Sequence, residues 1–168
     1  RYYFPPEKYP HWAFPGTEAS ERIYSRCTEL LREATGASFV NIRPISGVNA
    51  MTIALSALAP PDSTIATISP ENGGHSITAA VAERLGIHVV YLPYQQERFS
   101  IDTAALPEFI SRNHVSLVYL DQAHILFPYH IDRIRNVVDD RVKIYYDGSH
   151  VLGLIFGHVF ENPLHEGA

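Results

Sequence analysis

The chain has 168 residues, of which 46% are hydrophobic and 18% charged, and its formal net charge is −5. This composition is typical of a soluble globular domain and excludes disordered and fibrous chains. The negative charge gives no broad basic surface, so we expect neither nucleic acid nor an anionic membrane as a partner. Because no apolar stretch has the length of a membrane span and no signal peptide pattern is present, we expect a cytoplasmic protein.

The first part of the chain predicts an arm followed by a helix. Residues 1–16 are rich in proline and aromatic side chains and show no periodicity, which is typical of an extended arm. Residues 17–35 then repeat apolar positions on one helical face, and Gly36 ends the helix. The single cysteine, Cys27, lies on that face and is predicted to be a buried, unreactive thiol.

From residue 38 onward, short β-rich runs alternate with helical segments. Asp102 is predicted to be the N-cap of one of these helices. The alternation predicts an α/β fold, a three-layer sandwich with a mostly parallel sheet and helices on both faces. The strands are expected at 38–42, 64–69, 87–92, 115–120 and 142–146, and the helices at 47–58, 76–85, 103–113 and 131–138.

The turn Ser46-Gly47-Val48 precedes one of the predicted helices. It offers a hydroxyl, free backbone N–H groups and the positive end of the helix dipole, which together suit a phosphate. An ordinary capped helix start is the simpler alternative, since serine is a common N-cap. The turn is not a P-loop, because no Gly-Lys-Ser/Thr follows.

A second turn, Gly73-Gly74-His75, also joins a strand to a helix. The glycines allow the backbone to approach a ligand closely, and His75 can stack on a flat heteroaromatic ring, donate to an anion or cap the helix. The nine histidines show no spacing typical of metal ligands, so we predict no metal site.

Asp147 directly follows the apolar run 142–146 and precedes Gly148-Ser149-His150. Ligands of parallel α/β proteins bind beyond the carboxyl ends of the strands, so this acid is a functional candidate, with a helix cap as the alternative. A phosphate turn, a planar stacking residue and a carboxylate together predict a pyridoxal phosphate site. The carboxylate would pair with the pyridinium nitrogen and keep it protonated.

These motifs, in this order, resemble serine hydroxymethyltransferase and its relatives among the fold-type I pyridoxal phosphate enzymes, from about Glu18 to Ala168. The family has a phosphate-binding Ser-Gly turn, a Gly-Gly-His and an Asp-Met-Ala-His-x-x-Gly-Leu. The last of these is similar to Asp147-Gly148-Ser149-His150 followed by Gly153-Leu154. The resemblance implies part of an aspartate aminotransferase-like large domain, in a homodimer whose sites lie at the subunit interface.

The resemblance also assigns roles to individual residues. Ser46 and the Gly47 and Val48 backbone would bind the phosphate, and the catalytic set would be His75, which stacks on the ring, with Asp147 and His150. His150 would lie near the cofactor oxygen and the Schiff base. Gln122 stands where the family has a serine near the cofactor hydroxyl, and it is counted among the cofactor-binding residues.

The departures from the family bear on the substrate. Where folate-dependent members have two tyrosines before a Gly-Gly-Cys-Glu, residues 12–18 keep only Gly16 and Glu18, and the family's glutamate would fall near Pro6. The chain therefore looks more like folate-independent threonine transaldolases. These cleave threonine, a β-hydroxy-α-amino acid, and transfer the glycine carbanion to another aldehyde, so amino acids and aldehydes are the expected substrates.

The cofactor lysine has no counterpart in this chain, whose only lysines are Lys8 and Lys143. The family position would fall beyond Ala168, so we expect residues 17–168 to be part of a longer large domain and Lys143 to be exposed or at an edge. The alternatives are a folate-dependent hydroxymethyltransferase, another fold-type I lyase, and a lysine-less scaffold without catalytic activity.

Overall fold

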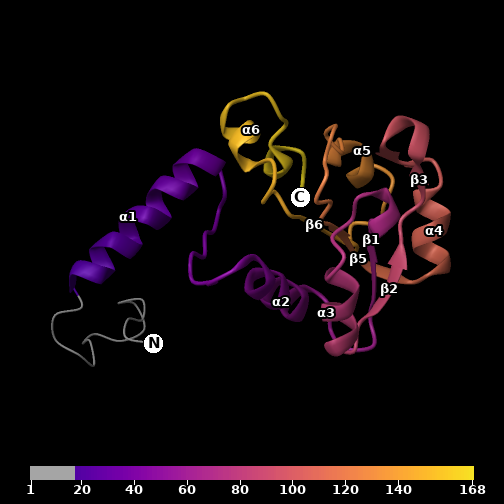
Figure 1. Cartoon of the computed structure of the whole chain (residues 1–168), viewed down its shortest axis with the longest axis horizontal. Helices are drawn as coiled ribbons and strands as arrows, with labels where there is room; N and C mark the ends of the chain where they lie inside the picture. Colours follow the sequence, from indigo (N-terminus) through magenta and orange to yellow (C-terminus); the bar gives the residue numbers. More distant parts are fainter. Residues whose placement is uncertain (1–17) are drawn as a thin grey trace. The chain divides into compact units, whose positions relative to one another are not determined.

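The structure is a computed structural model that describes residues 18–168, and the chain divides into two compact units, Arg1–Arg43 and Pro44–Ala168. The expected arm, residues 1–16, lies outside the described residues, as do the residues compared with the folate motifs up to position 17. Every residue assigned to the site from the sequence belongs to the second unit (Figure 1).

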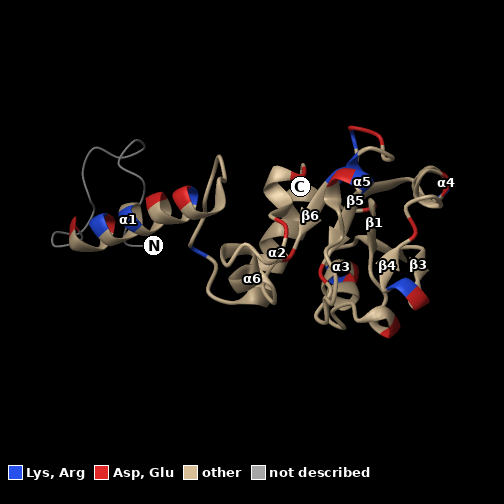
Figure 2. Cartoon of the chain, turned by 90° about the horizontal axis from the view of Figure 1, so that it is seen from above, with Lys and Arg blue, Asp and Glu red and all other residues tan. Residues whose placement is uncertain are grey.

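Helix α1 (Glu18–Thr35) is the main described element of the first unit, and acidic and basic residues are distributed along its length (Figure 2). It contains no buried residue, and even the apolar Ile23 is 66% exposed. Cys27 is exposed as well, so the prediction of a buried thiol is wrong. The apolar stripe of α1 predicts a helix correctly, but no described residue covers the thiol.

The expected strand over residues 38–42 does not form. A β-strand needs a neighbouring strand to satisfy its backbone groups, and none pairs with this segment among residues 18–168. Phe39 is 83% exposed. The β-rich composition of the segment is therefore not sufficient to make it part of the sheet.

A four-stranded parallel sheet organises the second unit, with the strand order β2-β1-β5-β6. The chain runs from β1 to β2 on one side and then returns to β5 on the other side of β1. The strand order thus reverses between β1 and β5, and ligands of such sheets bind in the crevice at this reversal. The strands are β1 (Thr64–Thr67), β2 (His88–Tyr91), β5 (Val115–Leu120) and β6 (Lys143–Tyr146).

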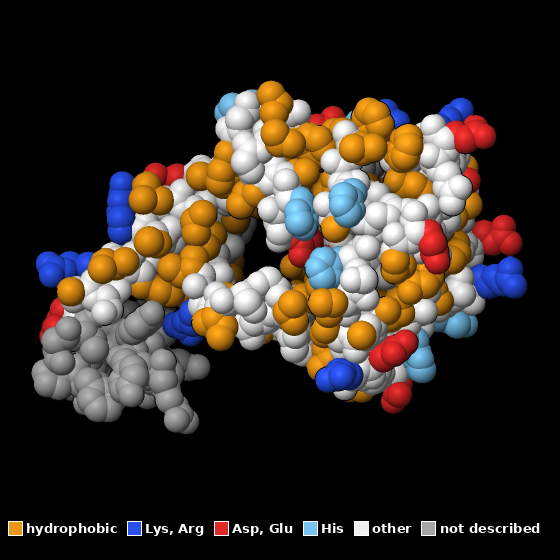
Figure 3. Space-filling model, in the orientation of Figure 1, with side chains coloured by type: hydrophobic (Ala, Val, Ile, Leu, Met, Phe, Trp, Pro, Cys, Tyr) orange, Lys and Arg blue, Asp and Glu red, His pale blue; other side chains and the backbone are white. Residues whose placement is uncertain are grey.

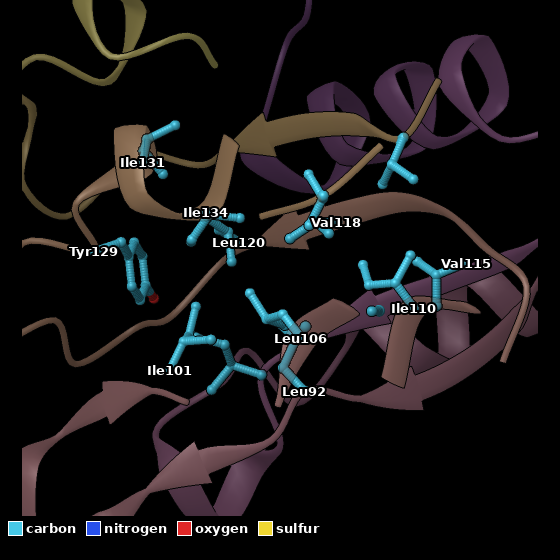
Figure 4. Packing of buried hydrophobic residues seen from close by; sticks show 14 residues of the cluster. Leu92, Ile101, Leu106, Ile110, Val115, Val118, Leu120, Tyr129, Ile131 and Ile134 are labelled. Carbon is cyan, nitrogen blue, oxygen red and sulfur yellow. The ribbon is translucent and has the colours of Figure 1, made fainter. Parts of the chain in front are cut away.

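Helices cover both faces of the sheet, which confirms the predicted α/β sandwich. On one face α2 (Gly47–Leu58) and α3 (Thr78–Arg84) enclose a core of buried residues. On the other face lie α4 (Leu106–Arg112) and α5 (Ile131–Arg135). The first core comprises Met51, Leu55, Ala59, Ile65, Ala82, Ile87, Leu117 and Tyr119. In the second, Leu92, Ile101, Leu106, Leu120 and Ile134 point toward one another (Figure 4).

Successive residues of the central strands alternate between these two cores, because side chains of a strand point to opposite faces. In β5, Leu117 and Tyr119 belong to the core under α2 and α3, whereas Val118 and Leu120 belong to the core under α4 and α5. This alternation determines which way the residues just after each strand point.

The remaining differences are at element ends. Helix α2 has the predicted bounds, whereas α3, α4 and α5 are shorter than predicted. Asp102 is not the N-cap of α4, because its Oδ1 accepts from the N–H of Ala104 in a turn and the helix begins after Ala105. Lys143 is exposed at the start of edge strand β6, as expected.

Several short elements were not predicted. They are the antiparallel pair β3 (Tyr94–Gln95) and β4 (Ser100–Ile101), helix α6 (Leu152–Phe156), and the 3-10 turns Pro70–Asn72, Gln96–Arg98 and Pro163–His165. Within residues 18–168, none of the helices combines the length and the apolar composition that a membrane span requires.

Candidate functional site

The turns that follow β1, β5 and β6 meet at the carboxyl edge of the sheet. Gly74 and Gln122 form an isolated β-bridge, and the N–H of Ala123 donates to the Gly73 oxygen at 2.8 Å. The N–H of Asp147 donates to the Leu120 oxygen at 2.7 Å, which extends the β5–β6 pairing by one residue. In Figure 3, histidine side chains gather around an acidic side chain close to β6.

Helix α2 directs its N-terminus to the same edge. Its last residue, Leu58, precedes β1 by a short loop, and the Leu58 oxygen accepts from Lys143 Nζ at the start of β6, at 3.0 Å. The end of α2 therefore lies at the amino edge of the sheet and its beginning at the carboxyl edge. Near that beginning, Thr78 Oγ1 of α3 lies 3.7 Å from Met51 Sδ.

Ser46 is the N-cap of α2, as one of the two sequence readings predicts. Its Oγ accepts from the Asn49 N–H at 3.1 Å, and Asn49 Oδ1 accepts in return from the Ile45 N–H at 3.1 Å. The N–H groups of Gly47 and Val48 have no partner among the described residues, and a Cβ built on Gly47 would meet nothing within 4 Å. The turn therefore caps the helix and still leaves two donors and open space for an anion.

The glycines of the second turn are required by the chain itself. A Cβ on Gly74 would stand 2.0 Å from the Ile68 oxygen, and Gly73 has a φ of +85°. The close approach that Gly74 allows is thus to the backbone of its own strand, and the close approach of a ligand stays a prediction. His75 follows, half-buried, with its Nδ1 accepting from the Ile77 N–H at 3.3 Å.

Gln122 points toward the α4 and α5 face of the sheet, two residues beyond Leu120. Its Nε2 donates to the Asn72 oxygen and to the Tyr94 hydroxyl, the latter at 3.2 Å, and its Oε1 accepts from the Tyr129 hydroxyl at 2.8 Å. Three of the four hydrogen bonds that the amide can make are therefore made within the chain. This network fixes the second turn, and the cofactor-binding role of Gln122 stays a prediction.

Asp121 points to the opposite face, toward α3, and was not singled out from the sequence. It is 3% exposed, and its two oxygens accept from the hydroxyls of Thr67, at 2.8 Å, and Thr78. Burial raises the pKa of the Asp121 carboxyl, the two hydroxyl donors and the nearby His75 lower it, and the neighbouring Asp147 raises it, with a net upward shift. The one sequence signal for Asp121 is that, like Asp147, it directly follows an apolar run.

Asp147 is half-buried beyond the end of β6. Its Oδ1 accepts from the Ser149 N–H at 2.9 Å, and its Oδ2 has no partner among the described residues. Helix α6 begins after Val151, so Asp147 closes a turn and does not cap that helix. His150 is exposed in the same turn. Asp147 thus has one oxygen fixed by the backbone and one available to a ligand.

Lys143 cannot take part in this site, because it lies at the amino end of β6, on the opposite edge. Lys8 is outside the described residues. Within residues 18–168, no group of three histidine, cysteine or acidic side chains could hold a metal ion. The groups available at this edge are therefore the free N–H groups of a helix start, an imidazole and two carboxylates.

The chain is similar to known transaldolases and hydroxymethyltransferases. It is 34% identical to L-threonine:uridine-5'-aldehyde transaldolase from a Streptomyces species, over all of this chain and 40% of the relative. It is 36% identical to serine hydroxymethyltransferase from Archaeoglobus fulgidus, over 92% of this chain and 36% of the relative. No protein-family model matches the chain.

A solved structure agrees. The crystal structure of L-threonine transaldolase from Pseudomonas fluorescens superposes with a TM-score of 0.87 and 33% identity, over 94% of this chain and 36% of that one. The resemblance predicted from the motifs and the α/β fold are thereby confirmed. The chain spans 36% to 40% of the length of these relatives.

Proposed function

We propose that these residues form part of the large domain of a pyridoxal phosphate-dependent enzyme, in the group that contains serine hydroxymethyltransferases and threonine transaldolases. The observation that carries the proposal is the meeting, at one sheet edge, of a free helix start, a half-buried imidazole and the available oxygen of Asp147. The similarity to two transaldolases and a hydroxymethyltransferase supports it. The Schiff-base lysine would lie outside these 168 residues.

The residues of this edge fit the cofactor. The N–H groups of Gly47 and Val48 and the Ser46 hydroxyl would hold the phosphate, since they are exposed and add the positive end of the α2 dipole. His75 would stack on the ring, because its Nδ1 is fixed by the turn and its half-buried imidazole is a planar group at this edge. His150, exposed three residues after Asp147, would donate to a cofactor oxygen.

Asp147 would accept the hydrogen bond of the pyridinium nitrogen through its second oxygen. Its first oxygen is held by the Ser149 N–H, so the carboxylate is already oriented. When bound, pyridoxal phosphate withdraws electrons from the α-carbon of an amino acid. A carboxylate that keeps the nitrogen protonated makes that withdrawal stronger.

We further propose that the reaction is aldol-type cleavage of threonine followed by transfer to a second aldehyde. The Cα–Cβ bond of threonine breaks, acetaldehyde leaves, and the electron pair stays on Cα. This carbon then adds to the carbonyl of the second aldehyde, whose oxygen takes the proton given up by the threonine hydroxyl. The similarity to two transaldolases supports this choice.

An assay of the complete protein tests this reaction. Purified protein is incubated with L-threonine and a second aldehyde, without folate, and acetaldehyde and the new β-hydroxy-α-amino acid are measured. We expect both products in equal amounts. A strict requirement for tetrahydrofolate would instead assign the chain to the hydroxymethyltransferases, and absence of cofactor absorbance would assign it to a scaffold. Size-exclusion chromatography of the same protein tests the expected homodimer.

The variant Asp147→Ala tests the position of the cofactor. We expect loss of more than about 99% of the activity, because the nitrogen then loses its only proposed partner. The free energy of unfolding should change by less than about 1 kcal/mol, since the side chain is half-buried and makes one hydrogen bond. Full activity of the variant would refute this position of the cofactor.

A further inference from the structure

Asp121 lies beside Asp147 on one face of the sheet. Leu120 pairs with Tyr146, so the next residues of the two strands, Asp121 and Asp147, are neighbours, and the Asp147 N–H donates to the Leu120 oxygen. Tyr119 and Tyr145, two residues earlier, pair in register and stack with ring centroids 4.4 Å apart. The strand alternation therefore directs both carboxylates to the face covered by α2 and α3.

The hydrogen bonds of Asp121 lie on both sides of the turn Gly73-Gly74-His75 in the sequence. Thr67 is the last residue of β1 and Thr78 the first of α3, so the two hydroxyls that Asp121 accepts stand just before and just after the turn that carries His75. Because both ends of the turn are attached to one buried carboxylate, the position of His75 depends on Asp121.

A purely structural role would not require a charge at this place. The groups that face Asp121 are the hydroxyls of Thr67 and Thr78, the His75 imidazole and the Asp147 carboxylate. The hydroxyls of Tyr119, Tyr129 and Tyr145 interact with it as well, and within residues 18–168 no lysine or arginine is among these groups. An asparagine would fill the same space and exchange hydrogen bonds with the same hydroxyls at no cost of burying a charge. The buried charge of Asp121 therefore lowers the stability of the fold, which indicates that it serves a function.

We propose that Asp121 is a positioning residue of the cofactor site, which fixes the His75 turn through Thr67 and Thr78 and adds a second negative charge beside Asp147, where the pyridinium would bind. This inference rests on the proposed function. A second carboxylate strengthens the attraction for a cationic ring nitrogen. The position is at the strand-order reversal between β1 and β5, where the crevice of the sheet opens.

The charge is tested with Asp121→Asn in the complete protein, with Asp140→Asn as the control because Asp140 is an exposed acid. Equilibrium dialysis measures the affinity for pyridoxal 5'-phosphate. We expect Asp121→Asn to weaken binding about tenfold, the effect of one charge a few ångströms from the ligand at a half-buried site, and Asp140→Asn to leave it unchanged. Equal affinity of Asp121→Asn and the unaltered protein overturns the proposal.

Stability gives a readout that is independent of the cofactor. The raised pKa of Asp121 means that the folded chain holds this proton more tightly than the unfolded chain, so ionisation costs stability at neutral pH. In the apo protein, Asp121→Asn should be more stable than the unaltered protein at pH 7, and the difference should vanish as the pH falls below about 4. A variant that binds less cofactor although it is more stable has lost function and not fold. A loss of stability at pH 7 contradicts the proposal.

The clamp on the turn is tested separately at Thr78. Thr78→Val removes the hydroxyl that donates to Asp121 and leaves the Asp121 carboxylate in place. Thr78→Ser keeps both this hydroxyl and the carboxylate. Hydrogen exchange of the amides of residues 73–75 should be faster in Thr78→Val and restored in Thr78→Ser. Unchanged exchange in Thr78→Val overturns the clamp. If the unaltered protein itself binds no pyridoxal phosphate, the proposed function fails first, and this inference with it.

Discussion

Tyr119 and Tyr129 are both buried, but only Tyr129 has a hydrogen-bond partner for its hydroxyl in the described part of the chain. Tyr129 donates to Gln122 Oε1 at 2.8 Å. Tyr119 is fully buried and stacks on Tyr145. Its hydroxyl interacts electrostatically with the Tyr145 hydroxyl but has no partner in hydrogen-bonding geometry among the described residues. A buried polar group without a partner costs about 1–3 kcal/mol.

The substitution of phenylalanine should therefore have opposite effects at these two positions. Tyr119→Phe should raise the free energy of unfolding by about 1 kcal/mol, because it removes an unpaired hydroxyl. Tyr129→Phe should lower it by about 1–2 kcal/mol, because it leaves the Gln122 oxygen without its donor. Urea denaturation of the two variants measures both changes. Equal signs for the two variants would show that the Tyr119 hydroxyl is paired.

Gly74 and Gly153 form a second contrasting pair. A Cβ on Gly74 would overlap the Ile68 oxygen at 2.0 Å, whereas a Cβ on Gly153, in helix α6, would meet nothing within 4 Å. We expect Gly74→Ala to destabilise the fold by about 3 kcal/mol or more and Gly153→Ala to stabilise it by up to about 1 kcal/mol. Thermal unfolding of both variants is the measurement, and a Gly74→Ala variant as stable as the unaltered protein would contradict the close approach.

At the level of elements, the N-terminus of α2 combines a helix cap and a proposed phosphate site. The two roles separate in Ser46→Asp, because aspartate caps helices as well as serine does but repels a phosphate. We expect Ser46→Asp to keep the stability of the unaltered protein and lose at least about tenfold in affinity for pyridoxal phosphate. Ser46→Ala should lose about 1 kcal/mol of stability.

The control for these variants is Ser56→Ala. The Ser56 hydroxyl is exposed and donates to the Thr52 oxygen in the last turn of the same helix, away from its start. Chemical unfolding gives the stabilities and equilibrium dialysis gives the affinities. Unchanged affinity in Ser46→Asp would show that the turn is only a helix cap, which is the alternative reading of the sequence.

Elements with local signals were predictable from the sequence. Helix α2 has the predicted bounds because the Ser46 cap and the residues after Leu58 mark its ends locally. The run at 38–42 has the composition of a strand, but strand formation depends on a partner that the composition does not specify. The two-residue strands β3 and β4 are too short to show a period of two.

The residues of the site also divide into those that lie in a local sequence motif and one that does not. Ser46, His75 and Asp147 lie in short motifs after or before predicted elements, so the sequence indicated them. Asp121 became visible only in the fold, because its partners Thr67 and Thr78 are 54 and 43 residues away along the chain. Separations of this size carry no periodic signal. The pairing of β1 with β5 brings Thr67 and Asp121 together, and the packing of α3 against the sheet adds Thr78.

At the level of the whole second unit, buried tyrosines make the free energy of unfolding depend on pH in the alkaline range. Burial raises the pKa of the Tyr119, Tyr129, Tyr145 and Tyr146 hydroxyls, for Tyr146 to about 12 from an ordinary value of 10.0, with Glu166 and Asp147 adding to the shift. Above pH 10 the unfolded chain loses these protons while the folded chain keeps them. The free energy of unfolding must therefore fall as the pH rises through this range.

Tyr146 provides the test, since its shift lies within a measurable range. The free energy of unfolding of the unaltered protein should be constant up to about pH 10 and decrease toward pH 12. Tyr146→Phe should decrease less steeply, because one of the protons that the unfolded chain releases is gone, whereas Tyr91→Phe, at an exposed side chain, serves as the control. Urea denaturation at pH 8, 10 and 11 gives the three curves. If Tyr146→Phe and the unaltered protein lose stability in parallel, the fold does not hold the Tyr146 hydroxyl neutral. The edge-on contact between the rings of Tyr146 and Tyr129, whose centroids are 5.6 Å apart, then admits water.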